Sequence, residues 1–218
     1  RENSRVAKLI GINKAARTTC VKPAGTTSLV LGTSSGIHAW HNEFYIRRLR
    51  VGKNEPIYKY LLAHNPDLVE DEYFRPHDTA VIEIPQSAPK GSIMRTESAF
   101  DLLKRIKQVA TQWVQPGHRK GSNTHNVSAT VSLKSDEWDK AGKWMWDNRE
   151  CYNGLAVLPY DGGTYTQAPF EDITKEEYNK RVKLLSDVDL SMIVETTDET
   201  DLSGELACAG GSCEISSL

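Results

Sequence analysis

The sequence lacks several features, and each absence excludes a class of protein. Its 218 residues contain no apolar run near the roughly 20 residues that a membrane-spanning helix needs, so we expect no membrane partner. The chain also lacks an excess of positive or negative charge, because its 27 Lys and Arg residues are nearly balanced by 29 Asp and Glu residues. A net charge of −2 gives no overall basic field, so we expect no nucleic-acid partner.

Cysteine is scarce as well, and the chain has no recognisable leader. Four cysteines in a chain of this size do not indicate the disulfide framework of a small secreted domain. We therefore expect a reducing, cytoplasmic setting. The chain starts at Arg1, without Met and without the apolar centre of a signal peptide, which favours a piece cut from a longer chain.

The apolar pattern that is present predicts an α/β fold. With 39% hydrophobic and 26% charged residues, the composition allows a real core, in one large domain or two small ones. Strands are expected at 17–22, 43–51, 79–85, 126–133 and 154–160. Helices are expected at 4–12, 54–64, 96–114, after a cap at Ser135, and at 174–185. Strands that alternate with helices are typical of βα units and a parallel sheet.

A short hydroxyl-rich loop follows the first expected strand. Pro23 ends that strand because it has no N–H for the ladder, and Leu29 begins a helix. The first amides of a helix have no hydrogen-bond partner within the helix, and the helix dipole favours an anion at this end. Gly25 lets the backbone approach a ligand, and Thr26, Thr27 and Ser28 carry hydroxyl donors. The residues alone leave two readings open: a phosphate-binding loop, or an ordinary turn in which Thr26 or Thr27 is an N-cap. The loop is not a Walker-type phosphate loop, because the spacing G-x-x-x-x-G-K-[ST] is absent.

For two other clusters of polar side chains, the sequence pattern favours a structural role over ligand binding. His38 and His41 are three residues apart, but no third metal ligand lies near them in the sequence, so packing or hydrogen bonding is favoured over metal. Arg47, Arg48 and Arg50 could contact phosphate. The charge balance of the chain favours an ion-paired face instead.

The end of the chain predicts a flexible acidic tail over 190–218. No Lys or Arg follows Lys183, and acidic residues are scattered among Thr, Ser and Gly. Cys208 and Cys213 lie near the end, separated by four small residues that allow a disulfide to close. Such a pair suits thiol–disulfide exchange. Zinc would need four ligands, and two unrelated surface thiols remain an alternative.

The loop carries a resemblance to a known family. The residues from Cys20 to Leu29, followed by those from Ser34 to His38, resemble the phosphate-binding loop of the coenzyme B12-dependent (class II) ribonucleotide reductases. They are close to that family's K-P-S-G-T-x-S-L form, with Ala24 where Ser is usual. Segments 117–133 and 155–170 match as well. The resemblance implies that the substrate phosphates are bound by Ala24, Gly25, Thr26, Thr27 and Ser28.

The resemblance also implies a fold, a cofactor and partners. The family fold is a ten-stranded α/β barrel, of which residues 1–189 would supply the C-terminal portion and 190–218 a tail. The implied cofactor is adenosylcobalamin, bound mainly by the full-length enzyme. The implied partners are the ribonucleotide, thioredoxin or a similar dithiol, and the remaining N-terminal part of the reductase. Cys208 and Cys213 match the family's redox shuttle pair, whereas Cys20 and Cys151 match no redox position and are expected to be buried and inert.

Some family motifs are missing, and their absence sharpens the prediction. The radical-cysteine motif Asn-Pro-Cys-Gly-Glu does not occur, so we expect it upstream of Arg1 and expect this chain alone to be inactive. A glycyl-radical Arg-Val-x-Gly-Tyr motif is absent, and the loop differs from the Pro-Thr-Ala-Ser-like loop of iron-dependent enzymes. The closest likeness is to the monomeric ribonucleoside-triphosphate reductases, which make deoxyribonucleotides for DNA replication. Two alternatives stay open: a non-catalytic nucleotide-binding α/β module with a thioredoxin-reactive tail, and a general α/β phosphate-binding enzyme.

Overall fold

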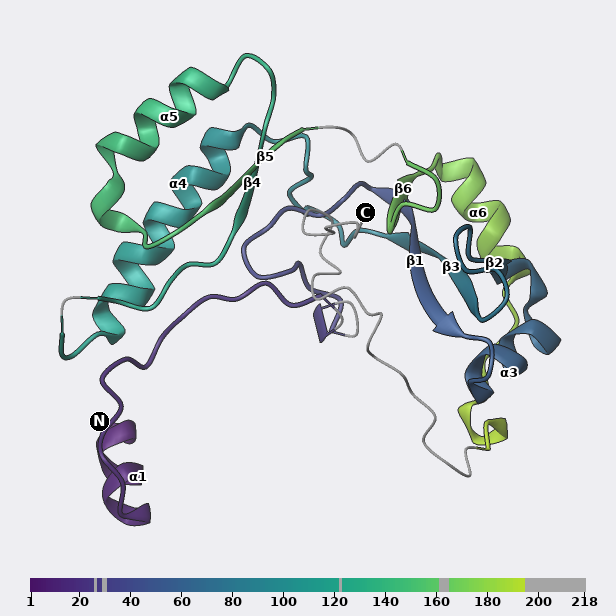
Figure 1. Ribbon diagram of the computed structural model, residues 1–218, viewed down its shortest axis with the longest axis horizontal. Helices are drawn as coiled ribbons and strands as arrows, with labels where there is room; N and C mark the ends of the chain where they lie inside the picture. Colours follow the sequence, from purple (N-terminus) through teal and green to yellow (C-terminus); the bar gives the residue numbers. More distant parts are fainter. Residues whose placement is uncertain (26, 29–30, 122, 161–164, 195–218) are drawn as a thin grey trace. The chain divides into compact units, whose positions relative to one another are not determined.

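The computed structural model describes residues 1–25, 27–28, 31–121, 123–160 and 165–194 (Figure 1). The chain divides into two compact units. The first unit comprises Arg1–Ala39 and Arg95–Tyr160, and the second comprises Trp40–Met94 and Asp161–Leu218. No helix within the described ranges is long and apolar enough to cross a membrane. The expected boundary between a domain and a tail at residue 190 stays a prediction.

The first unit is built around a parallel β-α-β arrangement. Strands β4 (Thr130–Leu133) and β5 (Ala156–Pro159) pair in parallel, and helix α5 (Trp138–Asp147) connects them. This agrees with the expected βα units, since a parallel pair needs a long crossover connection. The remaining helical elements are α1 (Glu2–Ile10), α4 (Ala99–Val109), a π-helical turn η2 (Ala110–Val114), and the 3-10 turns η3 (Gln115–Gly117) and η4 (Arg149–Cys151).

The core of the first unit lies between α4 and the inner face of β4. The strand expected at 126–133 has apolar residues at alternate positions, which predicts one buried face. This is confirmed, because Val127, Ala129, Val131 and Leu133 are all buried. They pack with Leu102, Leu103, Ile106, Ala110 and Val114. The apolar spacing of the helix expected at 96–114 also predicts Trp113 on its inner face, but this prediction is wrong, because 55% of Trp113 is exposed. The helix widens into a π turn at 110–114, which shifts the buried face to Val114.

The second unit is a four-stranded antiparallel sheet in the order β2-β3-β1-β6. Its strands are β1 (Phe44–Gly52), β2 (Val69–Asp71), β3 (Thr79–Ser87) and β6 (Phe170–Asp172). Its helical elements are α3 (Pro56–His64), η1 (Pro66–Leu68), α6 (Lys175–Leu184) and η5 (Leu190–Met192). A small core forms where Tyr60 and Leu61 of α3 pack with Ile82 of β3.

The expectation of parallel strands throughout is therefore wrong for 43–51 and 79–85. These two strands pair antiparallel over their whole length, from Phe44 opposite Ser87 to Gly52 opposite Thr79. The crossover through α3 leads to the short strand β2, and β3 then returns antiparallel between β2 and β1. Pro85 lies inside β3 and does not end it.

Local capping chemistry is seen at one end of α1, α4 and α6. Gly11 ends α1 in the left-handed region, with φ 73°, as expected for a C-terminal glycine. The residues Thr174 to Glu177 predict a capping box at the start of the expected helix 174–185. One half of it is confirmed at α6, where the Thr174 side chain accepts a hydrogen bond from the Glu177 amide at 3.2 Å. The expected cap at Ser135 is wrong, because 135–137 form a turn and α5 begins at Trp138.

Candidate functional site

The segment that leads into the loop is extended but is not a regular strand. Val21 forms an isolated parallel bridge with Val127, and its carbonyl accepts from the Ser128 amide at 3.0 Å. Upstream, the Thr18 amide donates to the Gly117 carbonyl at 3.0 Å. The expected strand at 17–22 is thus attached to its neighbours at separate points, and it delivers the loop beside β4.

The expectation that Cys20 is buried is wrong. Side chains alternate along an extended segment, so Thr19 and Val21 lie partly buried while Cys20 is exposed. Cys151 is half-buried, and burial raises the pKa of its thiol.

This difference gives a testable prediction about the two thiols. At about pH 8, iodoacetamide should modify Cys20 roughly tenfold faster than Cys151, because exposure and the thiolate form both favour reaction. Site-resolved mass spectrometry of peptides measures both rates in one sample. In concentrated urea the two rates should converge. Equal rates in the folded chain would contradict the burial of Cys151.

The loop itself contains four of the five expected phosphate-binding residues within the described ranges; Thr26 lies outside them. Ala24 and Gly25 are partly exposed, and Thr27 is exposed at the start of a helical turn. Ser28 is only 5% exposed, and its hydroxyl donates to the carbonyls of Ala24 and Gly25. The Ser28 hydroxyl thus braces the loop, while Thr27 and the backbone remain toward solvent.

A second turn packs directly against the loop. Gly36 has φ +61°, and a Cβ atom at this position would lie 3.0 Å from the Lys22 carbonyl oxygen. Only glycine combines that backbone conformation with so close an approach. The Ser34–Gly36 turn therefore supports the backbone of Lys22 and Pro23 from one side.

His38 fastens this second turn to the sheet. Its Nε2 accepts a hydrogen bond from the Thr130 amide at 2.9 Å, and its Nδ1 lies 2.8 Å from the Ser35 carbonyl. Since an amide only donates, Nε2 must be unprotonated and Nδ1 carries the proton. The expected hydrogen-bonding role of His38 is confirmed. His41 belongs to the second unit, where its Nε2 lies 2.8 Å from Asp172 and its ring stacks on Phe170. Within the described ranges, no group of three or more His, Cys, Asp or Glu could hold a metal ion.

Arg105 anchors the residue next to His38. Its guanidinium donates to the Ile37 carbonyl at 3.0 Å and pairs with Glu97 at 2.6 Å. The hydrogen bond to Glu97 raises the pKa of Arg105, so the anchor stays charged. The loop, the second turn and α4 are thereby joined by backbone and side-chain contacts.

Sequence reasoning missed a group of residues at the carboxyl ends of β4 and β5. Lys134 directly follows β4, and its Nζ lies 5.9 Å from the ring of Tyr160, which directly follows β5. Arg95 lies 5.7 Å from the same ring. In open α/β sheets, ligands bind beyond the carboxyl ends of parallel strands. The signal was available, because Lys134 comes immediately after the strand expected at 126–133 and Tyr160 ends the strand expected at 154–160.

The arginines of β1 are engaged within the second unit. Arg48 pairs with Glu83 and Glu171, and Arg50 lies 3.4 Å from Glu72. Burial alone would lower the pKa of Arg48, but the hydrogen bonds with Glu171 and Glu83 outweigh it and raise that pKa. The favoured reading of an ion-paired face is confirmed for these two residues.

The expected redox pair, Cys208 and Cys213, lies outside the described residues. Its role as a shuttle stays a prediction, and no geometry supports or opposes it here.

Comparisons with known proteins agree on one group of enzymes. A scan against models of protein families finds no match. The adenosylcobalamin-dependent ribonucleoside-triphosphate reductase of Lactobacillus acidophilus is 29% identical over 209 residues, covering 94% of this chain and 27% of that protein. The enzyme of the same name from Euglena gracilis is 29% identical over 204 residues, covering 89% of this chain and 26% of that protein.

A solved structure gives the same answer. The crystal structure of a B-12 dependent (class II) ribonucleotide reductase superposes with a TM-score of 0.69 at 25% identity, covering 85% of this chain and 25% of that chain. The chain spans about a quarter of the length of the relatives that it matches. The chain is therefore a homologue of the adenosylcobalamin-dependent ribonucleoside-triphosphate reductases, as the resemblance of its loop predicted.

Proposed function

We propose that this chain is part of a ribonucleotide reductase that converts ribonucleoside triphosphates to 2′-deoxyribonucleotides. The observation that carries the proposal is the similarity over 94% of the chain to an enzyme named for this reaction. The likeness in fold to a class II reductase, with a TM-score of 0.69, supports it independently of the loop motif.

The loop at 24–28 is the proposed binding site for the substrate phosphates. Three features support this role: the start of a helical turn at Thr27, the partly exposed backbone at Gly25, and the bracing by Ser28. A preorganised loop loses little conformational freedom when it binds an anion. Lys134 and Arg95, beyond the carboxyl ends of the parallel strands, add positive charge within the first unit.

The proposed reaction balances through thiols. Replacing the ribose 2′-hydroxyl by hydrogen releases one water, and two thiols supply the two electrons and two protons and become a disulfide. Cys208 and Cys213 would reduce that disulfide by exchange and become a disulfide themselves. A dithiol of the thioredoxin class would then reduce the pair.

Adenosylcobalamin is the cofactor that this proposal implies, and among the described residues of the first unit the hollow beside α1 is a candidate for its binding site. The hollow beside α1 is lined mainly by cationic and polar side chains, which do not fit the broad apolar face of a corrin. The described lining residues of this hollow are therefore not expected to bind the cofactor. In the proposed enzyme, the remaining N-terminal part would hold it.

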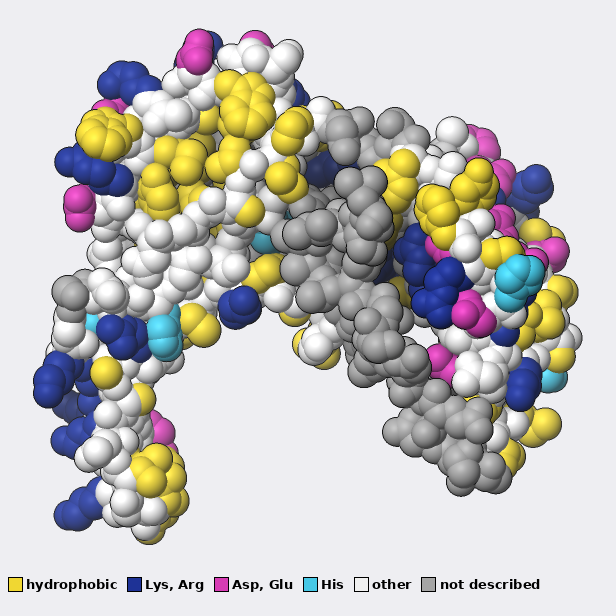
Figure 2. Space-filling view, viewed as in Figure 1, with side chains coloured by type: hydrophobic (Ala, Val, Ile, Leu, Met, Phe, Trp, Pro, Cys, Tyr) yellow, Lys and Arg dark blue, Asp and Glu magenta, His cyan; other side chains and the backbone are white. Residues whose placement is uncertain are grey.

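The exposed side of β5 supports an incomplete barrel. Within the described ranges β5 pairs only with β4, and Leu158 of β5 is 37% exposed. Figure 2 shows apolar side chains gathered over the part of the first unit where α4, α5 and β5 lie. Further strands from the remaining part of the reductase would cover this face in the proposed ten-stranded α/β barrel.

The loop assignment is tested by Gly25→Val in the full-length protein. A β-branched side chain would block the approach of phosphate to the backbone, so we expect the Kd for a ribonucleoside triphosphate to rise at least about tenfold. Isothermal titration calorimetry measures the Kd.

Gly154→Val is the matched control, because a Cβ at Gly154 meets no atom within 4 Å. It makes the same chemical change in open space and should leave the Kd unchanged. Unchanged affinity in Gly25→Val would remove the loop from the proposal.

A further inference from the structure

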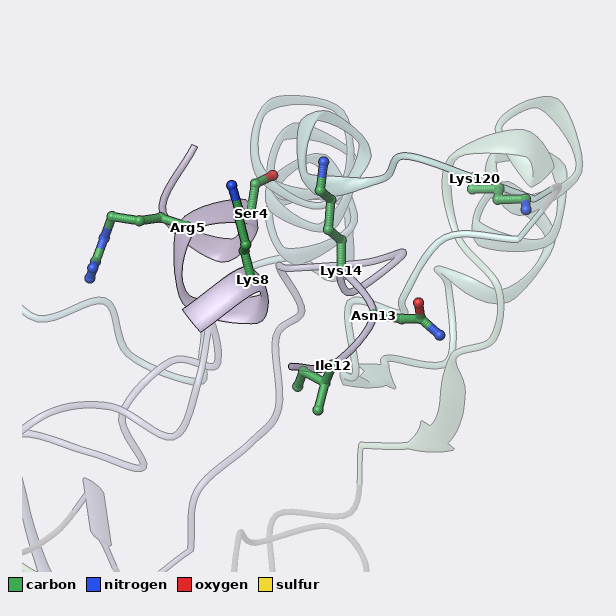
Figure 3. A pocket seen from close by; sticks show the side chains of 7 residues that line it. All are labelled: Ser4, Arg5, Lys8, Ile12, Asn13, Lys14 and Lys120. Carbon is green, nitrogen blue, oxygen red and sulfur yellow. The ribbon is translucent and has the colours of Figure 1, made fainter. Parts of the chain in front are cut away.

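A hollow of about 970 Å³ lies beside α1, and it is not part of the loop at 24–28. We call it the α1 pocket. α1, the segment after Gly11 and the 118–121 turn supply its lining. Its lining residues are Ser4, Arg5, Lys8, Ile12, Asn13, Lys14 and Lys120 (Figure 3). Four of these seven side chains are cationic, although the whole chain carries a small negative net charge.

The excess of cations arises from two stretches of sequence without acidic residues. No Asp or Glu occurs from residue 3 to 42 or from residue 102 to 135. The fold brings these stretches together. The Arg119 amide donates to the Ala16 carbonyl at 2.9 Å, and the Arg119 guanidinium donates to the Ser4 hydroxyl at 3.2 Å. Figure 2 shows dark blue side chains gathered around α1, with few acidic ones among them.

Three of the four cations are uncompensated. Arg5 is paired with Glu2, and Figure 3 shows its guanidinium extending away from the other lining side chains. Lys8, Lys14 and Lys120 are exposed, and their side chains make no hydrogen bond or ion pair with any described residue. In the view of Figure 3, the ammonium ends of Lys8 and Lys14 point to the same side, with the Ser4 hydroxyl between them.

This donor set fits a ligand that carries several anionic oxygens. Three ammonium groups, a hydroxyl at Ser4 and an amide at Asn13 are spread around one hollow. A single carboxylate or monophosphate would engage only part of them. A chain of phosphates presents charge at several points, and lysines bind phosphate as flexible point charges.

We propose that the α1 pocket binds a polyphosphate, such as the triphosphate group of a nucleotide. The inference gives the chain a second phosphate site, whose lining shares no residue with the loop at 24–28. It stands on charge and geometry of the first unit, and it would hold even if the proposed reductase activity failed.

The test is calorimetric titration of the full chain with inorganic triphosphate. Lys8→Gln, Lys14→Gln and Lys120→Gln should each weaken binding about threefold to fivefold, and the triple variant roughly thirtyfold or more. Inorganic monophosphate should bind the parent chain at least about tenfold more weakly than triphosphate. Affinity should also fall as salt rises from about 0.02 M to about 0.15 M.

Lys180→Gln is the control, because it removes the same charge from α6 in the second unit. It should leave triphosphate affinity unchanged. Equal weakening by Lys180→Gln and the pocket variants would overturn the proposal, since it would indicate non-specific attraction. Undiminished binding by the triple variant would overturn it too. Gly25→Val separates the two sites: it should leave the effects of the pocket variants intact even where ribonucleotide binding at the loop is lost.

Discussion

Glu83→Ala is expected to lower the free energy of unfolding by about 3–5 kcal/mol, because it removes the buried carboxylate between two arginines. Glu83 is only 3% exposed. Its Oε1 lies 2.7 Å from Nε and 2.6 Å from Nη2 of Arg48, and its Oε2 lies 2.9 Å from Nη1 of Arg181. Without it, the Arg48 guanidinium stays buried and loses the deeper of its two carboxylate partners.

The large effect follows from where the three residues lie. Arg48 and Glu83 are direct cross-strand neighbours on β1 and β3, and Arg181 reaches them from α6. The network therefore joins the helix to the centre of the sheet. Glu83→Gln should cost less than Glu83→Ala, because the amide keeps the shape and one acceptor. Urea unfolding followed by circular dichroism measures both variants.

The matched control is Glu177→Gln, because Glu177 forms an ion pair with Arg181 from a partly exposed position. A solvent-screened pair on a helix contributes little, so this variant should stay within about 1 kcal/mol of the parent chain. A Glu83→Ala variant that unfolds at the same urea concentration as the parent would contradict the assignment of the network as a stabilising centre.

The first unit could be predicted well because its signals are local. Apolar residues at alternate positions from Val127 to Leu133 face a core, and this pattern needs no knowledge of distant contacts. The continuous apolar run before Pro159 likewise predicted β5. A long helix between the two strands then leaves the parallel arrangement as the natural connection.

The second unit could not be predicted as well because its topology depends on β2. This strand has three residues, two of them acidic, and shows no strand pattern. Since α3 leads to β2, strand β3 is free to return antiparallel beside β1. The apolar pattern of Thr79–Pro85 fits a parallel strand as well as an antiparallel one. Only the pairing with neighbouring strands therefore decides the direction of this strand in the sheet.

For the candidate site, the sequence predicted the place of the loop but not its bracing. A proline and a glycine after an extended segment locate the turn. The contact from His38 to the Thr130 amide joins residues 92 positions apart, so no local pattern predicts it. The inward direction of the Ser28 hydroxyl also depends on how the loop closes on itself.

Cys208→Ser or Cys213→Ser in the full-length protein is expected to reduce thioredoxin-driven turnover about a hundredfold or more. This prediction rests on the proposed function and concerns residues outside the described ranges. Thiol–disulfide exchange between a reductant and a buried disulfide needs a pair of sulfurs that can reach both, and one thiol alone stops at a mixed disulfide. A small dithiol can enter the core directly, so turnover with it should persist in both variants.

Comparing turnover driven by thioredoxin with turnover driven by a small dithiol separates electron delivery from chemistry at the substrate. Cys20→Ser is the matched control: it removes an exposed thiol beside the loop and should leave turnover with either reductant unchanged. Loss with both reductants would place Cys208 or Cys213 in the chemistry or in folding, and would contradict a shuttle. Unchanged turnover with thioredoxin would show that electrons bypass the pair, and the general α/β phosphate-binding enzyme would then be the better description of this chain.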